Sequence, residues 1–121
     1  MKKALFIIGF LSAVAAVNAQ SISHIETTKS WYHIYDKGGR MIKTLSTGLG
    51  ELVGYSRSFY IIKKKTGFYI TYDVNGKQLH TFSTGVVGDI LSVSGDTFTS
   101  RKDSWIYTWS KEGKIISCRT R

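Results

Sequence analysis

Two carboxylates at matching positions of the chain are the first side chains whose type and spacing suggest chemistry. Glu51 begins the segment ELV after one glycine, and Asp89 begins DIL after another. A glycosidase needs two carboxyl groups that face one sugar, roughly 5–10 Å apart. Matching positions of a repeated unit usually lie farther apart than that. We therefore interpret both residues as solvated acids at the entry of a strand and predict no catalytic role for them.

The side chains that bind metals or act as nucleophiles are scattered along the chain. The histidines and the single cysteine are His24, His33, His80 and Cys118. No two of them have ligand spacing on one element, which makes them a poor zinc set. The segment DVNG, from Asp73 to Gly76, offers only two of the alternating oxygen ligands of a calcium loop and reads better as a turn.

Nucleophilic catalysis has no sequence support either, because there is no G-x-S-x-G segment and no recognisable Cys–His arrangement. We predict no metal, no cofactor and no enzymatic activity. A small secreted hydrolase, with a site assembled from distant residues, is the weakest alternative.

Positive charge is the strongest functional signal in the sequence. Two clusters occupy comparable points near the ends of predicted strands, and their members are Lys63, Lys64, Lys65, Arg101 and Lys102. We expect them to form a stripe on one rim, which would attract polyanions by counterion release and electrostatic steering. The tyrosines expected to face outward beside it are Tyr32, Tyr69 and Tyr107. The competing explanation is that the cations only provide solubility and protect strand edges.

The first 19 residues have the pattern of a secretory signal peptide. Lys2 and Lys3 precede the apolar run ALFIIGFLSAVAAV, and the segment VNA then ends at Ala19 with small residues where a signal peptidase reads them. The apolar run is shorter than the roughly 20 residues that span a bilayer, and no later segment is apolar enough to cross one. We predict a secreted or periplasmic protein with a single mature domain over residues 20–121.

The composition of that domain limits how it can be stabilised. Without Lys2 and Lys3, the 17 basic residues fall to 15 against 8 acidic residues, a net charge of +7. The single cysteine, Cys118, allows no intrachain disulfide, so stability must come from burial of the aromatic side chains. We expect Cys118 itself to be buried in a strand.

A repeat of 37 residues organises the domain. The segment YDKGGRMIKTLSTG at 35–48 returns as YDVNGKQLHTFSTG at 72–85. Trp31, Phe68 and Trp105 follow each other at the same interval, which is the signature of a repeat architecture. Because these three aromatic residues recur as a set, we expect them to lie in the core.

Each copy of the repeat predicts short antiparallel strands. The segments WYHIYD, FYITYD and WIYTWS are rich in aromatic and β-branched residues and are each followed by a turn with glycine at Gly39, Gly76 or Gly113. The strands are expected at about 31–36, 40–46, 51–56, 59–64, 68–73, 77–83, 89–94, 97–102, 105–110 and 113–119, with an extra one at 22–28. The domain is therefore predicted to be all-β, with about eleven strands and no convincing helix.

The repeat resembles the short WG-type repeats and, more loosely, the blades of a β-propeller. The matching features are an aromatic residue at the start, an aromatic–polar pair before the turn, and then glycine, a cation and an aliphatic pair, as in FYITYDVNGKQL and WIYTWSKEGKII. The glycine that should follow the first tryptophan is replaced by Tyr32, Tyr69 and Ile106. The resemblance implies a repeat-built binding scaffold and carries over no catalytic residue.

Two and a half copies cannot close a propeller of four or more blades. We favour a twisted meander or irregular barrel, or else two or three small packed sheets in which residues 22–28 pair near the last strands. The remaining arrangement is a ring completed by copies from several chains.

The function expected from these features is a secreted, non-enzymatic binding module at the cell envelope. Its partner would be a protein or an anionic polysaccharide, whereas nucleic acid does not suit a secreted protein. The alternative is a structural subunit that assembles with copies of itself or with a larger envelope complex.

Signal cleavage can be tested directly. We expect the protein exported from a bacterial host to begin at Gln20, because Ala19 ends the peptidase recognition segment. Intact-mass measurement of the exported protein checks this, and an exported chain that retains residues 1–19 would contradict it.

Overall fold

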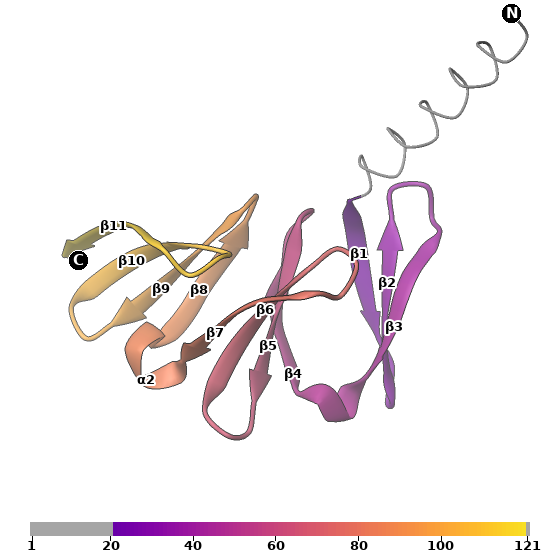
Figure 1. Ribbon diagram of the computed structural model, residues 1–121, viewed down its shortest axis with the longest axis horizontal. Helices are drawn as coiled ribbons and strands as arrows, with labels where there is room; N and C mark the ends of the chain where they lie inside the picture. Colours follow the sequence, from indigo (N-terminus) through magenta and orange to yellow (C-terminus); the bar gives the residue numbers. More distant parts are fainter. Residues whose placement is uncertain (1–20, 121) are drawn as a thin grey trace, which may run out of the picture.

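Residues 21–120 form eleven antiparallel strands in three separate sheets in the computed structural model of the chain (Figure 1). Residues 1–20 and 121 are not described, so the predicted signal peptide lies outside the described residues. Within the described part, no helix has the length and apolar character needed to cross a membrane.

The chain runs through the three sheets in order. The N-terminal sheet has the order β1 (Ile22–Thr27), β2 (Trp31–Asp36) and β3 (Met41–Ser46). The central sheet has the order β4 (Glu51–Tyr55), β5 (Phe59–Lys64), β6 (Phe68–Asp73) and β7 (Gln78–Ser83). The C-terminal sheet has the order β8 (Asp89–Ser94), β9 (Thr97–Lys102), β10 (Trp105–Ser110) and β11 (Ile115–Thr120). Short helical turns connect the sheets, η1 (Thr47–Leu49) and α2 (Thr84–Val87).

The predicted fold class is confirmed, since the three sheets resemble propeller blades and all eleven predicted strands are present. The first strand was expected to pair near the last strands, and this was wrong. Ile25 pairs with Ile34, and Thr27 with Tyr32, so β1 lies beside β2 in the N-terminal sheet. The chain forms three distinct sheets and not an irregular barrel, because each strand pairs only with strands next to it in the sequence.

The predicted hairpin turns are confirmed at the level of backbone geometry. Gly39, Gly76 and Gly113 have φ values of 82°, 87° and 104°, a region that glycine enters without steric cost. In the second turn the Asp73 carboxylate accepts hydrogen bonds from the backbone N–H groups of Asn75 and Lys77, both at 2.9 Å. The Asp73 carboxylate therefore serves the turn, as expected for DVNG.

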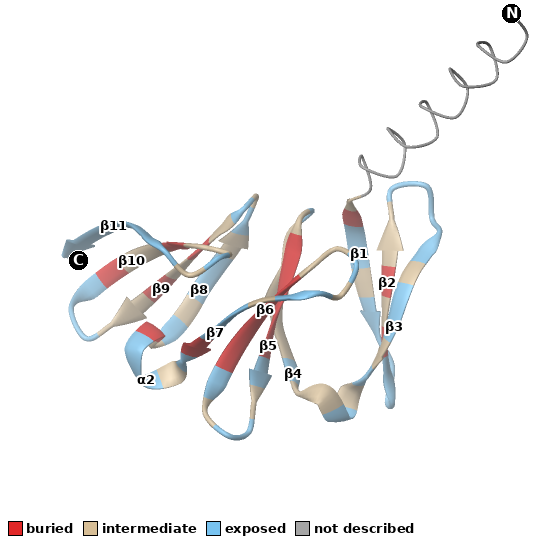
Figure 2. Cartoon of the chain, in the orientation of Figure 1, coloured by how far each residue is buried: buried red, intermediate tan, exposed pale blue. Residues whose placement is uncertain are grey.

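The core consists of two clusters, one on each face of the central sheet. Along β5, Tyr60 and Ile62 pack toward the N-terminal sheet, while Phe59 and Ile61 pack toward the C-terminal sheet. All four side chains are at most 1% exposed. Figure 2 shows this concentration of buried positions along β5 and β6. The three sheets therefore stack face to face, and the middle one is buried on both sides.

Two expectations about burial were wrong. Trp31, Phe68 and Trp105 are 48%, 42% and 43% exposed rather than buried. They do occupy matching positions, each as the first residue of the next-to-last strand of its sheet, beside a turn. Cys118, which was expected to be buried, is exposed, as are all the other residues of β11.

The outer face of the C-terminal sheet is polar where the matching face of the central sheet is apolar. Phe59 and Ile61 of β5 correspond to Thr97 and Thr99 of β9, and Phe82 of β7 corresponds to an arginine in β11. A row of hydroxyl side chains crosses all four strands of this face, formed by Ser92, Thr99, Thr108 and Ser117. Such a face is suited to solvent, as in the capping units of repeat proteins.

The stacking arrangement predicts unequal effects on stability for substitutions of two neighbouring valines in α2. Val87 is fully buried in the core, whereas Val86 is 59% exposed. We expect Val87→Ala to lower the free energy of unfolding by about 2 kcal/mol, because it removes buried methyl groups. Val86→Ala should change it by less than about 0.5 kcal/mol. Urea unfolding measures both, and equal effects of the two substitutions would contradict the face-to-face core.

Candidate functional site

One end of the three-sheet stack, here called the lower rim, carries the features that the sequence singled out. The turns β1–β2, β5–β6 and β9–β10 lie at this end, together with the helical turns η1 and α2 (Figure 1). The opposite end, the upper rim, carries the hairpin turns with Gly39, Gly76 and Gly113.

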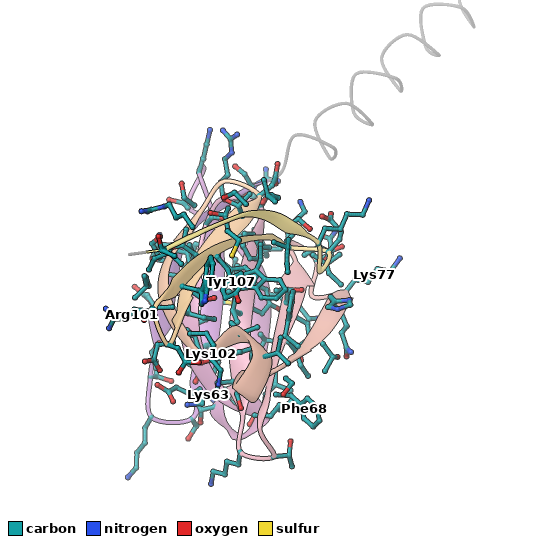
Figure 3. All side chains as sticks on the ribbon, turned by 90° about the vertical axis from the view of Figure 1, so that its left-hand side faces the viewer. Lys63, Phe68, Lys77, Arg101, Lys102 and Tyr107 are labelled. Carbon is teal, nitrogen blue, oxygen red and sulfur yellow. The ribbon has the colours of Figure 1, made fainter. Side chains whose placement is uncertain are left out.

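Both predicted clusters of positive charge lie at the lower rim. Lys63 and Lys64 end β5, Arg101 and Lys102 end β9, and Lys65 follows in the β5–β6 turn. The two strands occupy the second position of adjacent sheets, so the clusters are equivalent. We call these five residues the rim cations. In Figure 3, Lys63 and Lys102 lie in the lower half of the molecule, and Arg101 projects at its left side.

A pocket of about 630 Å³ opens at this rim between the N-terminal and central sheets. Lys63, Lys64 and Lys65 line it from the end of β5, and the residues of η1 line it from the other side. Glu51 is the one carboxylate among its lining residues. The pocket therefore carries a surplus of positive charge beside a wall of glycine and threonine.

Tyr32 holds the floor of this pocket in place. Its side chain is 6% exposed, its hydroxyl donates to the Gly50 carbonyl at 2.7 Å, and the same oxygen accepts from the Leu52 N–H at 3.1 Å. Gly50 has a φ of 151°, and a Cβ there would lie 2.7 Å from the Lys63 carbonyl oxygen. Close backbone packing between β4 and β5 thus positions the first lysine of the cluster.

The junction between the central and C-terminal sheets has the same geometry, but its connecting turn is one residue longer. The Tyr69 hydroxyl donates to the Gly88 carbonyl at 2.8 Å, and Gly88 packs against the backbone of Arg101. Here α2 has four residues where η1 has three, and its last residue, Val87, is fully buried.

The expectation that the three tyrosines face outward was wrong for two of them. Tyr32 and Tyr69 are 6% and 5% exposed and point into the core, whereas Tyr107 is half-buried beside Trp109. Burial, with the charges of Asp89 and Glu51 nearby, raises the pKa of the Tyr69 phenol. Tyr32 and Tyr69 therefore support the rim from inside the fold, through their hydrogen bonds to the Gly50 and Gly88 carbonyls.

The rim cations form no salt bridge with a carboxylate among residues 21–120. The ion pair in this part of the chain joins Lys111 to Asp96 at 3.0 Å, at the upper rim. Hydrogen bonds from Ser58 and Lys111 lower the pKa of Asp96. At the lower rim, the Lys63 ammonium lies 6.0 Å from the centre of the Tyr69 ring.

The other residues considered for chemistry are dispersed over the fold. Glu51 and Asp89 are exposed and begin the first strands of two different sheets. His24 and His33 lie in the N-terminal sheet, and His80 lies in the central sheet. Within the described residues, no three His, Cys, Asp or Glu side chains come together closely enough to hold a metal ion.

The sequence pointed to the lysines but not to the pocket beside them. Its wall comes from η1, where the Ser46 hydroxyl accepts from the Gly48 N–H at 3.1 Å, and Ser83 and Gly85 repeat this contact at α2. The repeated segment STG was the available signal, because a serine two residues before a glycine favours such a turn.

The chain has a structural similarity to a solved protein. No protein-family model and no curated protein matches it. The crystal structure of BamB from Moraxella catarrhalis is similar at a TM-score of 0.45 and 12% sequence identity. The match covers 80% of this chain and 34% of the BamB chain, so the chain spans about a third of that protein.

Two buried tyrosines provide a test of how the pocket floor is held. We expect Tyr32→Phe to lower the free energy of unfolding by about 1–3 kcal/mol, because the Gly50 carbonyl and the Leu52 N–H lose their buried partner. Tyr60 is 1% exposed, and its hydroxyl has no hydrogen-bond partner among the described residues. Tyr60→Phe should therefore be neutral or stabilising. Urea unfolding of both variants distinguishes these outcomes, and an equal loss in the two would refute the role given to Tyr32.

Proposed function

We propose that the chain is a secreted, non-enzymatic binding module whose lower rim recognises an anionic ligand at the cell envelope. The ligand would be an anionic glycan or an acidic protein. The observation that carries this proposal is the pocket of about 630 Å³ with three consecutive lysines, Lys63 to Lys65, along one wall.

The charge at the rim is available to a ligand. Lys63 and Lys65 are exposed, and none of the rim cations is engaged in a salt bridge within residues 21–120. An ammonium group that has no internal carboxylate partner keeps its full attraction for an external anion. Arg101 and Lys102 continue the positive surface onto the C-terminal sheet, which favours a ligand longer than the pocket itself.

The floor of the pocket is held by hydrogen bonds and by close backbone packing. The contacts of Tyr32 with Gly50 and Leu52 hold β4 in place, and Gly50 packs on the backbone of Lys63. A preformed site loses less conformational freedom when a ligand binds. This arrangement supports recognition, and it supports no particular bond-breaking chemistry.

The envelope location rests on the predicted signal peptide over residues 1–19. An exported protein with a positive rim meets anionic glycans, lipid phosphates and acidic proteins outside the cytoplasm. The net charge of +7 for residues 20–121 is consistent with a ligand of that kind.

The alternative, a ring or stack assembled from several copies, has less support. A further sheet packed on the C-terminal sheet would have to bury Thr97, Thr99 and Arg119, where the central sheet offers Phe59, Ile61 and Phe82. Burial of unpaired hydroxyl and guanidinium groups costs free energy instead of contributing it.

Charge reversal at the two rims tests the proposal. We expect Lys63→Glu/Lys64→Glu/Lys65→Glu to fold normally and to bind heparin at least about tenfold more weakly, because like charges now face the polyanion. The matched control is Lys37→Glu/Lys77→Glu/Lys114→Glu, which reverses three exposed lysines in the upper-rim turns.

Heparin–agarose retention and the salt concentration of elution provide the measurement. The control carries the same net charge as the lower-rim variant, so it corrects for long-range attraction. Equal retention of the two variants would show that the lower rim is not the binding surface.

A further inference from the structure

Three aromatic side chains at the lower rim are exposed although the repeat gives them the same position in every sheet. We call Trp31, Phe68 and Trp105 the rim aromatics, and each is more than 40% exposed. Large aromatic side chains stabilise a protein through burial, and leaving three of them half in water forgoes that stabilisation. Their regular exposure therefore calls for a role outside the core.

Two rim aromatics have a lysine directly opposite them in the sheet, and the third has one nearby in the sequence. Phe68 pairs directly across the sheet with Lys64, and Trp105 pairs directly with Lys102. Trp31 follows Lys29 in the β1–β2 turn. Directly opposite residues of an antiparallel pair project from the same face of the sheet. An exposed ring and an ammonium group are thus offered together on the central and C-terminal sheets, and Lys29 lies two residues from Trp31 at the matching point of the N-terminal sheet.

Within residues 21–120, no aromatic ring or cation stacks on these three rings. Among residues 21–120, the ring–ring contacts involve other side chains, and the cation–π contact joins Lys63 to Tyr69. In Figure 3, Phe68 lies at the lower end of the molecule, in the half that also contains Lys63 and Lys102. The rings remain free to stack on an external group.

The spacing of the rim aromatics follows from the stacking of the sheets. Sheets packed face to face lie on the order of 10 Å apart. Equivalent residues of successive sheets therefore recur in the same order along the rim. This makes a row of platforms, each with a cation beside it, and such a row fits a polymer that carries rings and negative charges at regular intervals.

We propose that the lower rim binds an anionic polysaccharide, with sugar rings stacked on Trp31, Phe68 and Trp105 and with sugar carboxylate or sulfate groups paired to the neighbouring lysines. This inference rests on the proposed function and specifies its ligand. Carbon-bound hydrogens on one face of a sugar ring fit the electron-rich face of an aromatic ring. An acidic protein is the less suitable ligand, because the energy of a protein interface gathers in a central cluster rather than along a regular row.

The contribution of ring stacking can be distinguished from that of charge by comparing the binding of two polymers that carry the same charged group. Polygalacturonate has carboxylates on sugar rings, and polyglutamate has carboxylates without rings. We expect the chain to bind polygalacturonate more tightly. Trp31→Ala/Phe68→Ala/Trp105→Ala should weaken polygalacturonate binding by about tenfold or more and change polyglutamate binding by less than about twofold.

Matched variants keep this test interpretable. Val86→Ala removes another exposed apolar side chain from the same rim and should leave both affinities unchanged. Trp31→Leu/Phe68→Leu/Trp105→Leu retains apolar volume without rings and should match the alanine variant in binding. Urea unfolding confirms that each variant is folded. In the wild type, polygalacturonate should alter tryptophan fluorescence, because Trp31 and Trp105 are exposed, and polyglutamate should not.

The possible results separate the two proposals. If the aromatic substitutions weaken both polymers equally or neither, ring stacking is refuted, while a loss in the lysine-to-glutamate variant still supports anion binding. Tighter binding of polyglutamate than of polygalacturonate would identify an acidic protein as the ligand and overturn the polysaccharide. If the wild type binds neither polymer nor heparin, both proposals fail.

Discussion

Face-to-face stacking on the central sheet is the constraint on which the rest of the structure depends. The N-terminal and C-terminal sheets each have one apolar face, and the central sheet supplies the surface that buries both. Phe59 and Ile61 on one side of β5, and Tyr60 and Ile62 on the other, are almost completely inaccessible to solvent. Each outer sheet buries its apolar face against the middle one, so the core of each depends on that contact. A hydrogen bond from the Thr71 hydroxyl to the Lys111 carbonyl, at 2.7 Å, also links the central and C-terminal sheets.

Stacking of repeated units also creates the lower rim. Because each sheet enters the stack in the same orientation, the ends of β5 and β9 and the starts of β2, β6 and β10 gather at one end. Cations and exposed rings that are distant in sequence therefore become neighbours on one surface. A difference of one residue between η1 and α2 distinguishes the two junctions, since Val87 occupies the core at the longer one and the lysine-lined pocket lies at the shorter one.

The two faces that point away from the central sheet have a different chemistry from the faces that it covers. On the C-terminal sheet, threonine replaces the phenylalanine and isoleucine found at the matching positions of β5. On the N-terminal sheet, His24 stacks on Tyr35 with ring centres 4.8 Å apart, and the Tyr35 hydroxyl donates to Glu26. Polar terminal faces allow a short stack of sheets to end in water without a closed ring.

The sequence by itself determined the all-β class, the positions of the eleven strands, the hairpin turns and the two clusters of cations. These features depend on local patterns, namely β-branched and aromatic runs, aspartate and glycine at fixed places in a turn, and consecutive lysines. Only the tertiary structure decided which face of each strand is buried. In β6 both Tyr69 and Ile70 are core residues, so alternation along the strand carries no information on which neighbour faces inward. For the same reason Trp31, which was expected in the core, is exposed, and Tyr32, which was expected to face outward, is buried. The face that a sheet buries is set by the sheet stacked against it, and that contact joins residues far apart in the chain.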